Sequence, residues 1–497
     1  MNHPAPPLSF LRYLLVTVML GIPLAAQAGT SPKTLSAQPN IVLIMADDLS
    51  AKEFQLYGGP IQTPNLERLA HGGMFYQAAW STPLCGPSRA MLMTGRYPFR
   101  TGFYHNQVKP PDADLWHHNI LLPQLLGRAG YHTAMFGKNH FGGDARSDYG
   151  FDESLTVEDW PGYDGPSQGL PNASDAGMYS VQWYWHPALL HNGEGIPTGP
   201  KDFGPDIEVD HIVEFIGANK HRPFFVYYPT NLPHQNYVPS RGRWAYTDVP
   251  ERDADGKLTG QRIEGSLESN AAYVDHLVGR IVAAVSEAGL AEQTIIMFVT
   301  DNGTAGYGKN HLETDKAVHV PLIVNAPGMI PPTGYVDTLV DFTDFLPTLV
   351  DLAHGELPFD YALDGHSFAP QIWGDTKFEG RSWIFTQMHL ARWFRDHDWL
   401  LDGNGRFYRI GDARTEVEGY EDVTLSTDPE VIAARRRFET YSEKTPKPDL
   451  DDPEVYARWR DLLEDRVEYN KLGDFAPYRP PYLDNEMSPT GPDHLSP

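Results

Sequence analysis

The 497-residue sequence predicts a doubly wound α/β fold, in which helices flank a mostly parallel sheet, followed by a small C-terminal α+β subdomain. Three observations lead to this prediction. Continuous apolar runs alternate with segments of helical periodicity, as buried parallel strands alternate with crossover helices. Four of these runs end abruptly in polar, charged or imidazole residues. From about residue 382 the alternation gives way to short strands and charged helices.

The first 28 residues have the pattern of a signal peptide. Arg12 precedes an apolar run over residues 14–24, and Ala-Gln-Ala at 26–28 offers a small-x-small cleavage site. The run is short for a membrane span, which needs about 20 residues, and a retained anchor is the alternative interpretation. No later stretch is apolar enough to span a bilayer. We therefore expect a secreted or periplasmic protein without a transmembrane segment.

The predicted catalytic α/β domain covers residues 38–381. Its elements are, in chain order, strand 40–45, helix 65–72, helix 121–126, strand 131–136, helix 207–220, strand 223–228, helix 271–288 and strand 294–300. Residues 154–200 lack periodicity and are rich in Gly, Pro, Trp and Tyr. This aromatic insertion is either a lid that stacks on sugar rings or the ordinary packing of a long insertion.

Residues 382–475 are predicted to form the C-terminal α+β subdomain. Runs at 399–401 and 406–410, joined by Asp-Gly-Asn-Gly, predict a hairpin. Charged helices are predicted over 428–441 and 453–469, and residues 476–497 form a Pro-rich tail that we expect to be extended.

The composition restricts the partners of the protein. The net charge of −26 argues against a nucleic-acid partner, which would favour a basic face. An anionic substrate would require cations concentrated at the site, because a local cluster can override the overall field. Cys85 is the only cysteine, so it cannot form an internal disulfide.

Chemistry-bearing residues follow the four apolar runs. Ligands of doubly wound folds bind beyond the carboxyl ends of the strands, so we expect these residues to share one site. They are Asp47, Asp48, Lys138, His140, His234, Asp301 and Asn302. Because hard divalent cations choose oxygen ligands, the carboxylates of Asp47, Asp48 and Asp301 and the amide of Asn302 predict a metal site.

Residues 83–96 carry the most specific motif. Cys85, Pro87 and Arg89 form the pattern C-x-P-x-R, and Thr-Gly-Arg follows at 94–96. This segment resembles the signature of the type I, formylglycine-dependent sulfatases of the alkaline-phosphatase-like superfamily. Further segments resemble family landmarks in order: NIVLIMADDL at 40, TPNLERLAHGG at 63, GKNHFGG at 137, YGFDES at 149, DNGTAG at 301, VPLIVNAPG at 320 and LDGHSFAPQIWG at 363. The resemblance covers about residues 38–425.

The resemblance implies that a formylglycine-generating (sulfatase-maturating) enzyme oxidises Cys85 to formylglycine, or 3-oxoalanine. The hydrated aldehyde offers two hydroxyls on one carbon. One attacks sulfur to form a covalent sulfate ester, and the other expels sulfate by collapse to the aldehyde. The implied cation is calcium, with magnesium as the chemical alternative, bound by Asp47, Asp48, the modified Cys85, Asp301 and Asn302.

The resemblance also implies roles for the cationic residues and histidines. Arg89, one helical turn beyond Cys85, orients the hydrate. Lys138 binds sulfate, His140 bonds the hydrate, and His234 protonates the departing alcohol. A second sulfate-binding lysine is expected near residue 309. We assign this role to Lys309 and keep Lys316 as the alternative. The segment that follows Lys309 is about one residue longer than in the family pattern, and His319 stands where arginine is common.

The sequence therefore predicts a sulfatase acting on sulfate monoesters, with carbohydrate sulfates as the expected substrates. A phosphonate or phosphodiester hydrolase of the same superfamily is one alternative. A non-catalytic sulfoglycan-binding protein with an unmodified Cys85 is the other.

Overall fold

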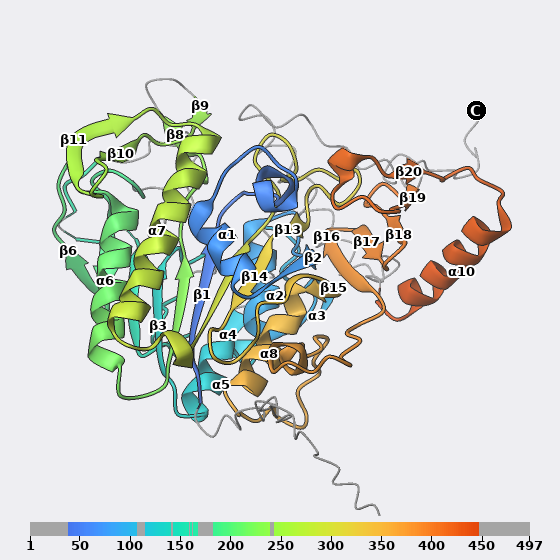
Figure 1. Cartoon of the computed structure of the whole chain (residues 1–497), viewed down its shortest axis with the longest axis horizontal. Coiled ribbons are helices and arrows are strands. Elements are labelled where there is room, and N and C mark those ends of the chain that lie inside the picture. The colour runs from blue at the N-terminus through green and yellow to red at the C-terminus, as the bar shows by residue number, and fades with distance from the viewer. Residues whose placement is uncertain are drawn as a thin grey trace, which may run out of the picture. The chain divides into compact units, whose positions relative to one another are not determined.

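A mixed sheet of 11 strands lies at the centre of the computed structural model (Figure 1). The structure describes residues 38–446, with gaps at 107–114, 141–142, 159, 162, 167–181 and 239–242. The strands are β1 (Asn40–Ala46), β2 (Met74–Trp80), β3 (His132–Gly137), β4 (Glu153–Val157), β5 (Leu189–His191), β6 (Glu194–Ile196), β7 (Phe224–Pro229), β12 (Thr294–Thr300), β13 (His319–Val320), β14 (Leu322–Asn325) and β15 (Gly334–Asp341).

The middle of this sheet is parallel. Across it the order is β13-β2-β14-β12-β1-β7-β3-β4-β5-β6, with β15 paired to β2. The neighbours β12, β1, β7, β3 and β4 run parallel, while β14, β13, β5 and β6 add antiparallel pairs toward the edges. The carboxyl ends of the central strands therefore meet at one edge.

Helices cover both faces of the sheet, which confirms the doubly wound prediction. One face packs against α1 (Pro64–His71), α6 (Gly204–Asn219) and α7 (Leu267–Glu287), and the other against α2 (Cys85–Thr94), α5 (Leu122–Arg128) and α8 (Phe345–Leu352). Alternate residues of β1 enter the two cores: Val42 and Ile44 face the first set of helices, and Ile41 and Leu43 face the second. Both faces of β1 are thus buried, which explains its continuous apolar run.

The eight predicted elements of the α/β domain are all present; β12 has the predicted bounds and the other seven have shifted ends. For example, α7 begins at Leu267 rather than 271, because the Ser266 hydroxyl caps it by accepting from the Ser269 amide. The remaining short helices are α3 (Pro98–Thr101), α4 (Leu115–His118), α9 (Ala369–Ile372), η1 (Ala51–Glu53), η2 (Gln55–Tyr57), η4 (Ala291–Gln293), η5 (Phe342–Asp344) and η6 (Glu416–Glu418).

Two stretches contain strands where no regular structure was predicted. Residues 154–200 include β5 and β6 and most of β4, which extend the sheet. The polar segment before α7 forms two hairpins, β8 (Asn236–Val238) with β9 (Arg243–Ala245) and β10 (Val249–Arg252) with β11 (Leu258–Ile263). Strands of three to six residues, partly exposed, are too short to show a hydrophobic period.

The C-terminal subdomain contains a second, antiparallel sheet. Its strands are β16 (Ile384–Met388), β17 (Ala391–Arg395), β18 (Trp399–Leu401), β19 (Phe407–Arg409) and β20 (Glu421–Asp422), followed by α10 (Pro429–Glu443). The pairing of β18 with β19 confirms the predicted hairpin. Phe385, Phe394 and Phe438 belong to the same hydrophobic cluster as the α2 side of the main core.

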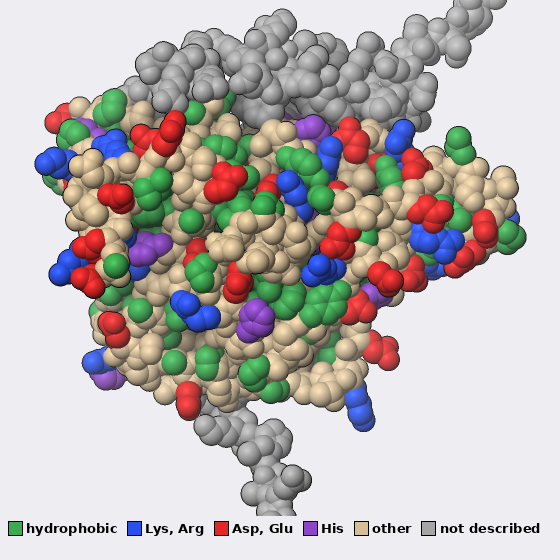
Figure 2. All heavy atoms as spheres, turned by 45° about the horizontal axis from the view of Figure 1, so that its top comes forward, with side chains coloured by type: hydrophobic (Ala, Val, Ile, Leu, Met, Phe, Trp, Pro, Cys, Tyr) green, Lys and Arg blue, Asp and Glu red, His purple; other side chains and the backbone are tan. Residues whose placement is uncertain are grey.

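Several predictions lie outside the described residues: the signal peptide, the helix over 453–469 and the C-terminal tail. The domain boundaries at 381 and 475 stay predictions. Among the described residues, the structure has no helix with the length and apolar content that a bilayer crossing needs. Acidic and basic side chains are interspersed over the face drawn in Figure 2. The cations that an anionic substrate needs are found instead in a buried cluster.

Candidate active site

The residues predicted at four strand ends meet at one edge of the main sheet. The strands that lead to them, β12, β1, β7 and β3, are consecutive neighbours. Ala46 pairs with Thr300 at the ends of β1 and β12, which places Asp47 beside Asp301. A parallel arrangement therefore unites residues that lie up to about 250 positions apart in the chain.

Three carboxylates and one amide form the acidic part of this cluster. Asp47, Asp48, Asp301 and Asn302 are each at most 2% exposed. The Asp48 amide donates to Asp301 Oδ1 at 3.1 Å, and Asn302 Nδ2 donates to Asp48 Oδ1 at 2.7 Å. Asp48 has a φ of 60°, a left-handed conformation that is uncommon outside glycine and concentrates at functional sites.

Helix α2 presents Cys85 to these acids from its first residue. The Cys85 Sγ lies 3.5 Å from Asp47 Oδ1 and 3.8 Å from Asp48 Oδ1, and the side chain is fully buried. Arg89 lies one turn further along the same helix face. Its guanidinium donates to Asp301 Oδ2 at 2.7 Å and to Asp47 Oδ2 at 3.2 Å, which fixes α2 against β1 and β12.

Two buried lysines complete the charge balance. Lys138, directly after β3, forms an ion pair with Asp47. The Lys309 Nζ lies 2.7 Å from Asp48 Oδ1 and 3.5 Å from Cys85 Sγ. Lys316 instead pairs with Glu313 at 2.9 Å, so the structure places Lys309 rather than its rival in the cluster.

The cluster thus holds three carboxylates and three permanent cations. Their pairing offsets the cost of removing these charges from water.

His234 faces Lys309 from the end of β7. Its Nε2 lies 3.1 Å from Lys309 Nζ and 3.5 Å from Asp48 Oδ2. Its Nδ1 bonds the Gln235 carbonyl, which can only accept, so Nδ1 carries the proton and Nε2 is the atom directed at the cluster. Burial lowers the pKa of the His140 imidazole well below its usual value, and the nearby charge of Lys138 lowers it further.

The electrostatic field of the cluster sets the protonation of its members. Burial opposes ionisation of Asp47, but Lys138, together with the other nearby cations, holds the pKa of its carboxyl well below the usual range. Burial and the charge of Asp47 raise the pKa of Asp301 to about 6. Burial, followed by the charges of Asp301 and Asp47, raises the pKa of the Cys85 thiol. The unmodified thiol is therefore protonated at neutral pH and a poor nucleophile.

These residues fit a hard divalent cation. Candidate ligand atoms of Asp47, Asp48, Cys85 and His234 lie within 4.8 Å of one another. The Asn302 Oδ1 is buried and has no hydrogen-bond partner, which is rare for a buried polar atom, and a cation beside it would satisfy this oxygen. Carboxylate and amide oxygens are the ligands that calcium and magnesium prefer.

Comparison with known proteins agrees with the geometry. The sulfatase family model matches residues 39–355. The chain belongs to the sulfatase family. It is 30% identical over 401 residues to arylsulfatase A of Homo sapiens, covering 73% of this chain and 72% of that protein. It is 30% identical over 371 residues to the N-acetylgalactosamine-6-sulfatase of Sus scrofa, covering 67% and 66%.

The fold of this sulfatase is also similar to solved structures. The crystal structure of Ps i-CgsB in complex with k-i-k-neocarrahexaose matches with a TM-score of 0.63 and 22% identity, over 88% of this chain and 100% of that chain. Family membership identifies the chain as a sulfuric ester hydrolase, and the alkaline-phosphatase-like fold predicted from the sequence is confirmed.

The structure adds residues to the sulfatase site that the sequence did not indicate. The Asn106 Oδ1 accepts from the Gly86 amide at 2.8 Å, next to Cys85. The indoles of Trp183 and Trp244 lie edge-on to the His234 ring, with centroids 5.2 and 5.9 Å away. None belongs to a short motif, and only Trp183 lies in the aromatic insertion noted above.

Trp183 and its neighbour Tyr184 are fully buried, which favours the packing interpretation for these two residues. Residues 167–181 of the insertion lie outside the described part.

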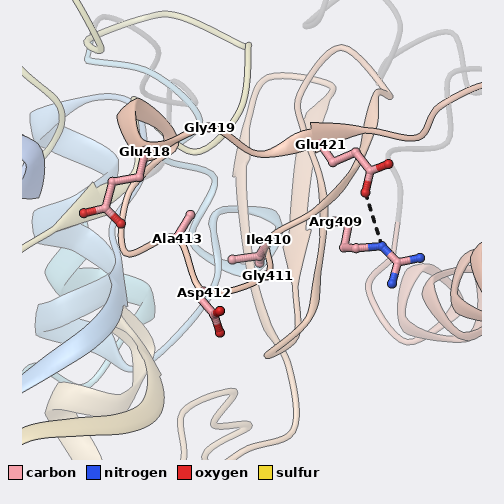
Figure 3. Close-up of a pocket in the computed structure, with 8 residues that line it drawn as sticks. All are labelled: Arg409, Ile410, Gly411, Asp412, Ala413, Glu418, Gly419 and Glu421. Carbon is pink, nitrogen blue, oxygen red and sulfur yellow. Dashed lines mark ion pairs between the residues drawn. The ribbon is translucent and has the colours of Figure 1, made fainter.

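A surface pocket of about 420 Å³ in the C-terminal subdomain is a separate feature (Figure 3). It is lined by Arg409, Ile410, Gly411, Asp412, Ala413, Glu418, Gly419 and Glu421. None of these residues belongs to the catalytic cluster, and Arg409 is already paired with Glu421 at 3.4 Å. This pocket is therefore separate from the cluster at the strand ends.

Proposed function

We propose that this sulfatase hydrolyses sulfate monoesters of carbohydrates, using formylglycine made from Cys85 as nucleophile and Ca²⁺ as the bound cation. The position of Cys85 carries the proposal. Its Sγ lies among two metal-type carboxylates and Lys309, yet the thiol has a raised pKa. A thiolate that attacked sulfur would leave an S-sulfo adduct with no ready exit, whereas an aldehyde hydrate supplies two hydroxyls on one carbon, one to attack and one to expel sulfate.

Asp47, Asp48, Asp301 and Asn302 would hold the cation, with calcium preferred and magnesium as the alternative. When bound, the cation supplies Lewis-acid stabilisation of the attacking hydroxyl and of the sulfate oxygens. Arg89 keeps Asp47 and Asp301 in place through its two ion pairs.

Three groups of the chain act on the ester itself. Lys138 and Lys309 are buried cations beside Cys85, so they can neutralise the sulfate oxygens in a site of low dielectric. His234 directs Nε2 at the cluster while Nδ1–H bonds Gln235, so the ring would give a proton to the departing alcohol from its doubly protonated, cationic form. His140 is suited to bond a hydroxyl at position 85.

A carbohydrate substrate is supported by three observations. The N-acetylgalactosamine-6-sulfatase of Sus scrofa is a relative, and the similar Ps i-CgsB structure contains an oligosaccharide. The half-buried Trp244 beside His234 offers an aromatic face near the leaving group. Sulfated mono- and oligosaccharides should therefore be turned over with higher kcat/KM than a simple aryl sulfate. Activity on the aryl ester alone would contradict the substrate assignment.

The nucleophile is tested by the mass of the tryptic peptide of residues 69–89. Conversion of Cys85 to formylglycine lowers this mass by about 18 Da, because sulfur and two hydrogens are exchanged for oxygen. Protein from a host with the maturating enzyme should carry the lighter peptide and be active. Protein from a host without it, and Cys85→Ala, should be inactive. An active enzyme with an intact thiol would refute the mechanism.

The two alternatives have separate outcomes. A phosphonate or phosphodiester hydrolase would cleave the phosphorus ester faster than a matched sulfate ester. A sulfoglycan-binding protein would bind the sugar with an unmodified Cys85 and no turnover.

We further propose that the protein is exported to the periplasm or the medium. The support is the pattern of residues 1–28, and cleavage after Ala28 would leave Gly29 as the first residue. N-terminal sequencing of the exported protein tests this, and recovery of the full chain in membranes would favour the retained anchor.

A further inference from the structure

A second cluster of metal-type side chains lies outside the catalytic site. Asp315 lies in the loop before β13, His319 begins β13, and Glu416 begins η6 in the C-terminal subdomain. One candidate ligand atom from each lies within 4.8 Å of the others. Asp315 and His319 are at most 1% exposed, and Glu416 is half-buried, so the cluster is accessible from one side.

The ring of His319 is oriented as a ligand. Its Nε2 lies 2.7 Å from the Gln77 carbonyl oxygen. Because a carbonyl only accepts, Nε2 carries the hydrogen, and Nδ1 of the neutral ring has a bare lone pair. This Nδ1 is buried without a hydrogen-bond partner, and it faces Asp315 Oδ2 at 3.9 Å. Metal-binding histidines typically donate their other N–H to a backbone carbonyl in this way.

The carboxylates are fixed by neighbours that leave one oxygen unsatisfied. Asp315 Oδ2 accepts from Arg395 at 2.7 Å and from the Tyr420 hydroxyl at 3.2 Å. Asp315 Oδ1 is buried and has no partner. Glu416 Oε1 accepts from the Tyr307 hydroxyl at 2.6 Å. The cluster therefore holds two acceptor atoms, His319 Nδ1 and Asp315 Oδ1, that lack a donor.

A cation satisfies both acceptors at once. Arg395 pairs with Asp315 and the charge of Lys52 acts on Glu416, but neither cation donates a hydrogen bond to His319 Nδ1 or Asp315 Oδ1. The structure points to a divalent transition metal ion of zinc's class, which we infer binds between Asp315, His319 and Glu416. One imidazole and two carboxylates suit such an ion, whereas the oxygen-rich catalytic set suits calcium. Bonds of about 2.0–2.2 Å would require the ligand atoms, now within 4.8 Å of one another, to move closer together.

The ion would connect two parts of the sulfatase. Asp315 belongs to the loop that carries Lys309 into the active site, and Glu416 belongs to the C-terminal subdomain. Bound metal would hold this loop in place without touching the substrate.

The test uses the full-length protein, stripped of metal and then saturated with Ca²⁺ to occupy the catalytic site. Titration with Co²⁺, followed by its visible absorption, should show about one further ion per chain with nitrogen and oxygen ligands. Glu416→Gln should raise the Kd for this ion by roughly 10- to 100-fold or more. That is the usual effect of losing a residue that only hydrogen-bonds a metal ligand, and Glu416 would be a ligand itself. Glu418→Gln is the matched control, because it removes the same charge from the same short helix, where Glu418 pairs with Arg414.

Two further variants locate the ion. His319→Gln should alter the absorption spectrum by removing the nitrogen ligand, and Cys85→Ser should leave binding unchanged. Zn²⁺ should raise the Tm of the wild type and of Glu418→Gln, but not of Glu416→Gln. The inference is overturned if no additional Co²⁺ binds, if Glu416→Gln binds as the wild type does, or if only Cys85→Ser loses the ion. These measurements need no turnover, so they stand apart from the proposed reaction.

Discussion

The structure adds most to the assignment of Lys309, because its Nζ contacts Asp48, Cys85 and His234 together. Lys309→Ala should lower kcat/KM for a sulfate ester by about 100- to 1,000-fold, the usual cost of removing one preorganised charge-stabilising donor. Lys316→Ala is the control from the same loop and should change kcat/KM by less than about threefold, as expected for a partly exposed ion pair. Equal losses in the two variants would contradict the assignment.

At the residue scale, the structure brings the predicted groups together at one edge of the sheet, and their roles stay predictions. The metal-type acids, Cys85, Arg89, Lys138 and both histidines follow a strand end or belong to a specific motif, whereas Lys309 was assigned over Lys316 although its spacing departs from the family pattern. Asn106, Trp183 and Trp244 were not predicted, since each reaches the site through loops whose course depends on tertiary packing.

At the element scale, the strands that the sequence predicted correctly are those buried on both faces. β1, β7 and β12 are uninterrupted apolar runs because helices cover each side. The short strands β5 and β6 near the edge of the sheet, and the hairpin of β10 with the exposed β11, carry no such pattern, so only the folded chain shows them.

Helix α6 contains a buried acid that allows a test of stability. Glu208 is fully buried beside the Tyr228 hydroxyl, and burial raises its pKa to about 8. Its proton is retained in the folded state and lost in the unfolded state between about pH 4.5 and 8. The wild type should therefore lose stability as pH rises through this range.

Glu208→Gln removes this titration while keeping the shape of the side chain. The Tm of the variant should exceed that of the wild type at pH 8, and the difference should shrink toward pH 4.5. The exposed Glu214→Gln on the same helix serves as control. A constant difference across pH would show that Glu208 does not titrate as described.

At the scale of the whole molecule, the chain is strongly acidic, whereas the charges in the cluster are balanced. The chain carries a net charge of −26, yet its catalytic cluster contains three carboxylates balanced by Arg89, Lys138 and Lys309. The charge of the whole chain therefore did not indicate an anionic substrate, whereas the strand-end motifs did.

Metal removal should weaken the entire protein, because the catalytic acids join loops that follow β1 and β12. A cation that binds only the folded state stabilises it by mass action, by about 2.7 kcal/mol at 100 times its Kd. EGTA should therefore lower the Tm and abolish sulfate ester hydrolysis, and excess Ca²⁺ should restore both. In the Asp48→Asn variant, added Ca²⁺ should raise the Tm by less than in the wild type. An unchanged Tm and rate after exhaustive chelation would argue against a resident calcium ion.

The burial of Cys85 also restricts the order of events in the life of the chain. Its side chain is fully inaccessible, in the first turn of a helix whose ten residues are all buried. The proposed conversion of Cys85 would therefore require an unfolded chain, because the folded protein leaves this side chain inaccessible to an oxidising enzyme. A molecule that folds before conversion would keep its thiol and, under the proposed mechanism, lack a nucleophile.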